Sequence, residues 1–200
     1  MREVRFDVEG ESAAGTLHEP TGTARGQVVL VHGLLSQASE FEDLPEKLAQ
    51  RGWRVLALDS RGHGLSTTRT DGSTRTLREF GAADILAMEK DLDAVRAYLG
   101  VEPRLLVGAS LGANEALRRA AGHPEIAAVA LLSPGLDYRG LTTRDANAAH
   151  AGAALFVASE EDAYATQSAR QLDAAHARGP HALQVYQGKG HGTNLLDEAT

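Results

Sequence analysis

Apolar residues follow two different periods along this chain. Six short apolar runs, each bounded by glycine, proline or charged residues, are typical of buried strands. They cover residues 26–33, 53–59, 103–109, 126–134, 152–160 and 181–188. Between them, apolar residues recur at the spacing of one helix face, which predicts helices. These helices are expected over residues 39–51, 77–99, 111–122 and 164–178.

The N-terminal segment shows a third pattern. Residues 2–20 alternate apolar and polar positions on either side of Gly10. Alternation of this kind predicts half-buried strands joined by a turn. We therefore expect an antiparallel hairpin before the first buried strand. Residues 60–76, by contrast, are polar and rich in turn formers, which is typical of a loop.

The order of these segments indicates the architecture. Strands that alternate with helices form a parallel sheet that helices cover on both faces. No repeat, low-complexity run or linker interrupts the order. The sequence thus predicts one α/β domain over residues 1–200, with a doubly wound, mostly parallel sheet and an antiparallel N-terminal hairpin. Ligands of such sheets bind beyond the carboxyl ends of the strands, so residues that follow strands are candidates for chemistry.

Composition narrows the classes of function. The chain is 42% hydrophobic and 24% charged, and its net charge is −7. Because no block of Lys or Arg offsets this charge, nucleic acid and anionic membranes are not expected partners. The absence of cysteine excludes disulfides, thiol nucleophiles and cysteine metal sites. Residues 1–11 lack the apolar core of a signal peptide and no run reaches membrane-spanning length, so a cytoplasmic location is expected.

Ser110 stands in the strongest candidate motif. The segment Gly108-Ala109-Ser110-Leu111-Gly112 joins a predicted strand to a predicted helix, which is the setting of a nucleophile elbow. The serine of an elbow has a strained backbone with a positive φ angle. Its side chain crowds the positions two before and two after, which requires glycine at both. The alternative reading is an ordinary glycine-rich turn.

A nucleophilic serine needs a base, and the base needs an acid that orients it. Of eight histidines, only His191 follows the last predicted strand, between two glycines. Asp162 comes soon after the preceding strand and is the favoured acid, whereas Glu160 and Glu161 are interpreted as solvated charges. Asp137 is the alternative acid, although a Pro-Gly turn separates it from its strand.

An acyl-transfer site also needs hydrogen-bond donors for the oxyanion of the tetrahedral intermediate. The backbone amide of Leu111 begins the predicted helix and gains from the helix dipole. The second donor is expected in the loop after residues 26–33, where the amide of Leu34 is the candidate and Gly33 lets the backbone approach. Both leucines would act through their amides and not through their side chains.

Five segments in this order, "VHGLL", "DSRGHGLS", "VGASLGA", "ASEEDAY" and "GKGHGT", resemble the motifs of the α/β-hydrolase superfamily. Among its branches, the chain is most similar to small, lidless, dienelactone-hydrolase-like serine hydrolases. The resemblance implies the α/β-hydrolase fold. Matched motif by motif, it implies that Ser110 is the nucleophile, Asp162 the acid and His191 the base, with the amides of Leu34 and Leu111 as the oxyanion hole.

The chain departs from the family pattern at several places. Dienelactone hydrolases proper use cysteine, which is absent here, so their substrate is not implied. Ser110 argues against dehalogenases and epoxide hydrolases, which place aspartate at the elbow. Residues 59–64 usually support the site structurally in this family, so His63 is interpreted as non-catalytic. Nine residues follow His191, so the family's C-terminal helix is expected to be shortened to residues 193–199 or clipped.

The expected activity is hydrolysis of carboxylic esters through an acyl-serine intermediate. A thioesterase or an amidase would use the same machinery, and a non-catalytic binding protein on this fold is the alternative from another class. The sequence contains no metal-ligand cluster, phosphate loop or dinucleotide fingerprint, so no cofactor and no metal are expected. The expected partner is a small-molecule ester, and the sequence leaves the oligomeric state open.

Substrate preference depends on the connection between strands 126–134 and 152–160. About twenty mostly polar residues there are too few for a cap domain with its own core, so no cap is expected. The pocket walls should come from this segment, including Leu136, from Leu34 and Leu35, and from the polar loop 65–76. Such a shallow site would bury few methylenes, which predicts a preference for acyl groups of about two to six carbons.

Overall fold

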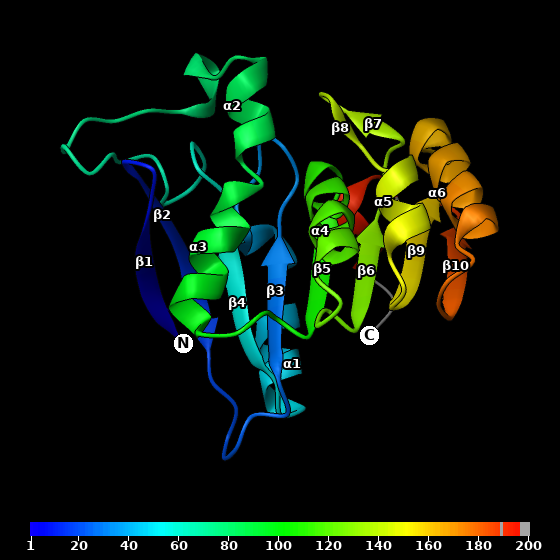
Figure 1. The fold of residues 1–200 in the computed structure, drawn as a ribbon, viewed down its shortest axis with the longest axis horizontal. Helices are drawn as coiled ribbons and strands as arrows, with labels where there is room; N and C mark the ends of the chain where they lie inside the picture. The colour runs from blue at the N-terminus through cyan, green and yellow to red at the C-terminus, as the bar shows by residue number, and fades with distance from the viewer. Residues whose placement is uncertain (189, 197–200) are drawn as a thin grey trace.

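The computed structural model describes residues 1–188 and 190–196. An eight-stranded sheet runs through it in the order β1-β2-β4-β3-β5-β6-β9-β10 (Figure 1). Its strands are β1 Arg2–Val8, β2 Glu11–His18, β3 Gln27–Val31, β4 Arg54–Asp59, β5 Leu105–Ala109, β6 Ala128–Leu132, β9 Ala153–Ser159 and β10 His181–Tyr186. From β4 to β10 all neighbours pair in parallel, whereas β2 pairs antiparallel with β1 and β4. The predicted α/β architecture is confirmed.

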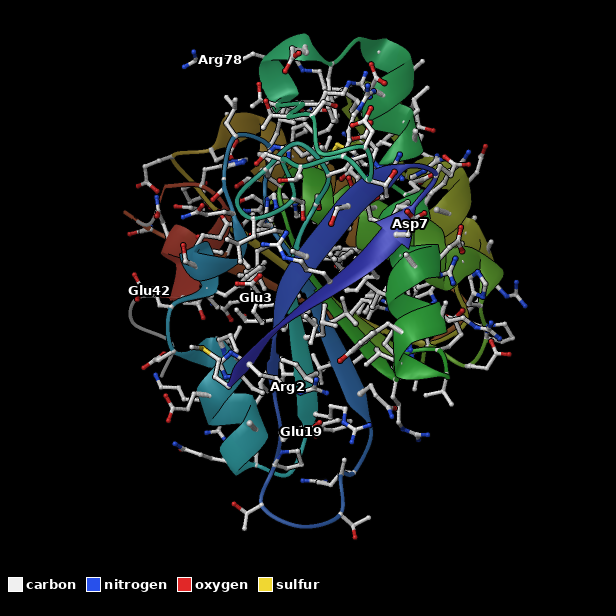
Figure 2. The ribbon with its side chains drawn as sticks, turned by 90° about the vertical axis from the view of Figure 1, so that its left-hand side faces the viewer. Arg2, Glu3, Asp7, Glu19, Glu42 and Arg78 are labelled. Atoms are coloured by element: carbon white, nitrogen blue, oxygen red, sulfur yellow. The ribbon has the colours of Figure 1, made fainter. Side chains whose placement is uncertain are left out.

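The N-terminal hairpin forms one edge of this sheet. Val4 and Val8 of β1 are buried against the core. Glu3 and Asp7 alternate with these valines along the same strand, and Arg2 begins it (Figure 2). Charged side chains on an edge strand oppose pairing with the strand of another molecule. The alternation that predicts the hairpin therefore also protects its outer edge.

Helices cover both faces of the sheet, and the side chains of β3 are buried on both faces. The covering elements are η1 Ala38–Phe41, α1 Leu44–Gln50, α3 Lys90–Leu99, α4 Leu111–Gly122, α6 Ala163–Ala175 and η3 Gly192–Leu196. Val29 and Val31 pack in one core with α3, α4 and α6. Val28 and Leu30 pack in the other core with η1, α1 and η3. A strand that is buried on both faces reads as a continuous apolar run, as residues 28–31 do.

Two predicted helices are divided in the structure. The helix expected over 39–51 becomes η1 and α1, because Glu42 between them has a φ of 48°. The helix expected over 77–99 becomes η2 Leu77–Glu79, α2 Ala82–Ala87 and α3. Local capping explains the second division. The carboxylates of Glu79 and Asp84 accept the backbone N–H groups of Thr76 and Gly81, both at 2.8 Å, and each bond starts a new short element.

The connection after β6 is short, as expected. It forms a two-stranded hairpin, β7 Asp137–Tyr138 and β8 Leu141–Thr142, and one short helix, α5 Arg144–Ala149. Figure 1 shows α2 and this hairpin beyond the same end of the sheet, where the parallel strands finish. Among the residues that the structure describes, no segment forms a separate cap.

The end of the chain is described only in part. η3 Gly192–Leu196 occupies the start of the shortened helix expected over 193–199, and residues 197–199 lie outside the described residues. None of the helices within 1–188 and 190–196 combines the length and the apolar character that crossing a lipid bilayer requires.

Gly108 and Gly112 let α4 pack directly against the ends of two strands. A Cβ atom on Gly112 would lie 2.2 Å from the carbonyl oxygen of Val31 in β3, and one on Gly108 would lie 2.2 Å from the carbonyl oxygen of Gly112. The need for glycine at both positions is confirmed, but its cause differs from the expected one. The nearest obstacles are backbone atoms of β3 and α4, and not the side chain of Ser110.

We expect Gly112→Ala to lower the free energy of unfolding by about 3 kcal/mol, because the new methyl group must displace backbone atoms of β3. Gly122→Ala, at the other end of α4, is the matched control, since a Cβ there meets no atom within 4 Å. It should be neutral or stabilising by up to about 1 kcal/mol. Urea unfolding measures both variants. Equal stability of the two would show that the contact between α4 and β3 is not tight.

Candidate active site

Ser110 lies in the turn between β5 and α4, where its φ is 55° and its ψ is −118°. These angles are strained for a residue other than glycine, and such strain is concentrated at functional sites. The backbone N–H of Ser110 donates to the carbonyl of Leu132 in β6 at 2.8 Å. This bond anchors the turn to the neighbouring strand, and the Ser110 side chain stays partly exposed.

Asp162 and His191 come together beside this turn. The carboxylate of Asp162 is hydrogen-bonded to Nδ1 of His191. Its other oxygen accepts the N–H of Ala165 at 3.0 Å, so Asp162 is also the N-cap of α6. The cap fixes the carboxylate on the helix end, and the second oxygen remains directed at the histidine.

The loop that carries His191 is attached to the elbow through Gly192. The N–H of Gly192 donates to Oγ of Ser133, at the end of β6, at 2.9 Å. A Cβ on Gly192 would lie 3.9 Å from that of Ala109, the residue before Ser110. The structure therefore brings the neighbours of His191 and Ser110 into contact.

The other carboxylates of this region have different partners. Asp137 accepts the N–H of Gly140 at 2.7 Å and so closes the β7–β8 turn. Glu160 pairs with Arg170 at 3.0 Å on the surface. Glu161 accepts the N–H of Gly188 at 2.6 Å and is hydrogen-bonded to Ser159. The interpretation of Glu161 as a merely solvated charge was therefore wrong, because this carboxylate holds the turn that leads toward His191.

Two backbone amides next to Ser110 are available as donors. The amides of Leu34 and Leu111 have no hydrogen-bond acceptor within the part of the chain that the structure describes. Gly33 brings the two segments together, since a Cβ at Gly33 would lie 3.3 Å from the Cβ of Ser110. Both amides flank the hydroxyl-bearing residue, as an oxyanion hole requires.

Buried polar groups hold the loop that contains Leu34. His63, which is buried, accepts the N–H of Leu35 on Nε2 at 3.3 Å, and its Nδ1 faces the carbonyl of Arg61 at 3.0 Å. Asp59 accepts the N–H of Ala38 at 2.6 Å. The contacts of His63 are thus structural. Its bond to the N–H of Leu35 stabilises the strained backbone there, where φ is 66°.

His32 completes this support. Its Nε2 accepts the N–H of Ser60 at 3.0 Å, so its Nδ1 donates to the carbonyl of Gly33 at 2.7 Å. Burial lowers the pKa of His32 to about 4, which keeps the imidazole neutral and preserves these two roles near pH 7. The carbonyl of Gly33 is fixed in this way, and with it the peptide unit that contains the Leu34 amide.

Tyr138 is a site residue that sequence reasoning missed. Its ring contacts that of His191 edge-on, with centroids 6.4 Å apart. Burial, and then the nearby Asp162 and Tyr164, raise the pKa of the Tyr138 hydroxyl, which donates to the backbone carbonyl of Ser133 at 3.3 Å. The hydroxyl is therefore protonated at neutral pH. Tyr138 lies in the polar connection after β6, where no motif distinguishes it.

An apolar pocket of about 430 Å³ opens beside the Leu34 amide. Its apolar walls are formed mainly by Leu34, Leu35, Leu77, Phe80, Ala82 and Ile85, and Arg139 completes the lining. Leu34 and Leu35 are where the sequence predicts them, and Arg139 comes from the connection after β6, also as predicted. The remaining walls come from the segment of η2 and α2 and not from the polar loop 65–76. Leu136 is not part of this lining, because it packs against the core that α4 and α6 share.

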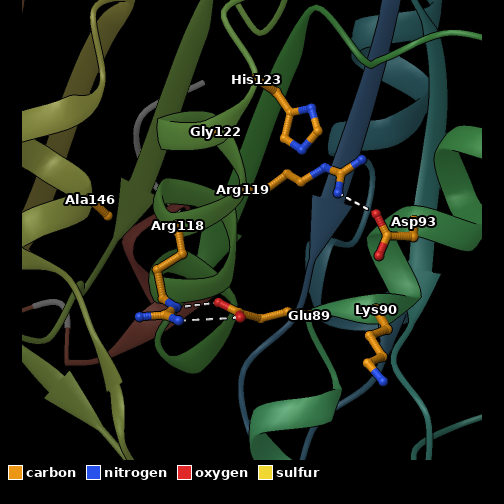
Figure 3. A pocket seen from close by; sticks show the side chains of 8 residues that line it. All are labelled: Glu89, Lys90, Asp93, Arg118, Arg119, Gly122, His123 and Ala146. Atoms are coloured by element: carbon orange, nitrogen blue, oxygen red, sulfur yellow. Dashed lines mark hydrogen bonds and ion pairs between the residues drawn. The ribbon is translucent and has the colours of Figure 1, made fainter.

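A second hollow, of about 410 Å³, lies between α3 and α4 and has a different character. Figure 3 shows that charged side chains line it and pair with one another, Arg118 with Glu89 and Arg119 with Asp93. These pairs join the two helices. Within residues 1–188 and 190–196, no three His, Asp or Glu side chains form a group that could hold a metal ion.

Comparisons with known proteins identify the fold family. The sequence profile of the alpha/beta hydrolase fold family matches residues 26–152. The sn-1-specific diacylglycerol lipase ABHD11 of Mus musculus is 34% identical over 100 residues, which are 50% of this chain and 29% of that protein. The chain covers 29% to 41% of the length of this lipase and of three other curated relatives that it matches.

Two solved structures resemble the whole chain. Est1E from Butyrivibrio proteoclasticus, with ferulic acid bound, superposes with a TM-score of 0.79 at 16% identity, covering 98% of this chain and 92% of that one. Dienelactone hydrolase from Anabaena variabilis gives a TM-score of 0.70 at 19% identity, covering 99% and 89%. At these identities the likeness concerns the fold. The family profile extends over more than half of the sequence, and the chain belongs to the alpha/beta hydrolase fold family.

Proposed function

We propose that this chain is a serine hydrolase that cleaves carboxylic esters, with Ser110 as nucleophile, His191 as base and Asp162 as the acid that orients it. The observation that carries the proposal is the Asp162–His191 hydrogen bond, on a loop that packs against the strained Ser110 turn. When Nδ1–H of the imidazole donates to the carboxylate, Nε2 is left free to accept a proton.

The first half of the reaction forms the acyl-enzyme. Oγ of Ser110 attacks the ester carbonyl carbon while its proton passes to Nε2 of His191. The carbonyl oxygen becomes an oxyanion and accepts hydrogen bonds from the amides of Leu34 and Leu111. When the tetrahedral intermediate collapses, the C–O bond to the alcohol breaks, and His191 returns the proton to the leaving oxygen.

The second half releases the acid. Water takes the place of the alcohol and attacks the acyl carbon while His191 accepts its proton. The second tetrahedral intermediate uses the same two amides, and its collapse returns the proton to Oγ of Ser110. Asp162 stays ionised throughout and stabilises the imidazolium that forms twice in each cycle. Every group required by this cycle belongs to the chain itself.

The relatives support an ester substrate within this proposal. The matched proteins include a diacylglycerol lipase and a monoacylglycerol lipase. Thioesters and amides would use the same groups, and they are the second choice because two of the matched relatives are lipases. A non-catalytic binding protein is the remaining alternative, but it would have no use for a strained serine beside two unpaired amides.

Ser110→Ala should abolish covalent labelling by a fluorophosphonate probe, because among the described residues only Ser110 places a hydroxyl in the strained turn beside the two amides. Ser73→Ala is the control and should label normally, since Ser73 is exposed and its hydroxyl bonds only to Asp71 in the described contacts. Intact mass spectrometry reads both. Full labelling of Ser110→Ala, with an unchanged circular dichroism spectrum, would contradict the proposed nucleophile.

Asp162→Asn should lower kcat by about 10⁴-fold, because an amide in place of the carboxylate favours the wrong tautomer of the histidine. Asp137→Asn tests the alternative acid with the same chemical change. It should leave kcat close to the wild-type value, since Asp137 accepts only the N–H of Gly140 in the described contacts. Steady-state hydrolysis of a nitrophenyl ester measures both. A larger loss from Asp137→Asn would reverse the assignment.

The pocket volume supports a preference for short acyl groups. About 430 Å³ lies in the lower part of the range of roughly 300–1,000 Å³ for small-molecule sites. We expect kcat/KM for nitrophenyl esters to rise up to acyl chains of about six carbons, by the transfer free energy of each methylene, and then to stop rising. A series from acetate to decanoate tests this, and a continued rise to decanoate would show a longer channel.

A further inference from the structure

Arg139 gives the apolar pocket its one charged wall among the described residues that line it. The remaining lining is aliphatic, aromatic or glycine. We propose, on the basis of the function proposed above, that the substrate is an ester of a dicarboxylic acid whose second carboxylate is free. Its short apolar chain would lie in the pocket, and its carboxylate would bind Arg139.

The position of Arg139 in its turn is the first argument. Strands β7 and β8 pair Tyr138 with Leu141, so that Arg139 and Gly140 form a two-residue connection. Their φ angles are 56° and 91°, as in the hairpin turn that strongly prefers Asn-Gly or Gly-Gly. Arginine at a positive φ is strained, and a residue retained against local preference points to a role other than the turn.

The charge of Arg139 is the second argument. Arg139 makes no ion pair or hydrogen bond with any residue in the described parts of the chain. Arg75, by contrast, lies 4.7 Å from the centre of the Phe80 ring and is neutralised by Asp84 and Glu11, at 2.6 and 2.9 Å. A guanidinium without a carboxylate partner, at the side of an apolar pocket, is suited to bind a carboxylate through two parallel hydrogen bonds.

The route from the reacting carbonyl to Arg139 is the third argument. Leu34 lines the pocket and also carries one of the two unpaired amides. Leu111, which carries the other, packs in one cluster with Ile85, a further wall of the pocket. Tyr138, next to Arg139, contacts the ring of His191 edge-on. An acyl chain whose carbonyl oxygen lies at the two amides can therefore extend along these walls to Arg139.

The test compares two substrates that differ only in charge, the p-nitrophenyl hemiester of adipic acid and p-nitrophenyl methyl adipate. The wild-type enzyme should have the higher kcat/KM for the hemiester. Arg139→Gln should lower the ratio of the two kcat/KM values by about tenfold, the equivalent of one charge-assisted hydrogen bond, mainly through KM. Arg139→Lys should restore part of the ratio, and high salt should reduce it in the wild type.

Arg78→Gln is the matched control. It removes the same charge from the neighbouring η2 segment, but Arg78 points away from the molecule and does not line the pocket (Figure 2). Its ratio should equal that of the wild type. A wild-type preference for the methyl ester, or equal loss in Arg78→Gln and Arg139→Gln, would overturn the proposal.

Binding separates this proposal from the proposed function. Ser110→Ala retains the pocket, so its affinity for monomethyl adipate, measured by NMR titration, should exceed its affinity for dimethyl adipate and fall when Arg139→Gln is added. Hydrolysis of both nitrophenyl substrates without charge preference would leave the hydrolase intact and refute the carboxylate site. Arg139-dependent binding with no hydrolysis of either substrate would refute the hydrolase and leave the site intact.

Discussion

The contact between the start of α4 and the end of β3 is the constraint on which the site depends. The backbone of Gly112 lies so close to the carbonyl oxygen of Val31 that a Cβ atom at this position would be 2.2 Å from it. Only glycine can therefore occupy this position without a shift of the backbone. Because α4 begins in contact with β3, the turn between β5 and α4 is tight. Ser110 adopts a φ of 55° in this turn. Gly33 lies against this turn, since a Cβ at Gly33 would be 3.3 Å from that of Ser110. The approach of α4 to β3 therefore determines where Ser110 and the first amide of α4 lie.

The other parts of the site are attached to this turn by polar contacts at strand ends. The loop that contains Leu34 is held by the buried side chains of His32, His63 and Asp59. Each of them forms a hydrogen bond with a backbone group of this loop. The His191 loop is bonded to Ser133 and Asp162. The buried bonds among these, made by His32, Asp59 and Ser133, are costly to break, so they hold in place loops that have little apolar surface of their own. Rigid loops keep donors and acceptors oriented before a substrate binds.

The sequence predicts the strands and the elbow because their physical requirements are local. Residues 28–31 are buried on both faces and therefore wholly apolar, and glycine is needed wherever α4 approaches backbone. The division of residues 77–99 is less visible, since Ile85, Met88, Leu92 and Val95 keep a helical spacing across the break. The carboxylates of Glu79 and Asp84 cause this division, because each accepts a backbone N–H group that would otherwise lack a partner at the start of a helix.

Features that arise from tertiary contacts could be predicted only in part. The connection after β6 is an expected pocket wall, and Arg139 lines the pocket, but the sequence of this connection does not distinguish Tyr138 or Arg139 from its other residues, and it gives no sign that η2 and α2 form the facing wall. Glu115 is a similar case. Burial, and then the charges of Asp91 and Glu89, raise its pKa well above the ordinary value, although its place in α4 gives no sign that a carboxyl group lies in the core. The spacing of apolar residues along the sequence does not reveal which helix packs against which part of the sheet.

The central claim is that Ser110 forms a covalent acyl intermediate, and trapping that intermediate tests it most directly. The wild-type protein would be mixed with p-nitrophenyl acetate, quenched with acid within the first turnovers, digested and examined by mass spectrometry. We expect one acetyl group on the peptide that contains Ser110. It should form in step with the initial release of nitrophenol and disappear as turnover ends. Turnover without an acetylated peptide, or acetylation at a residue other than Ser110, would contradict it.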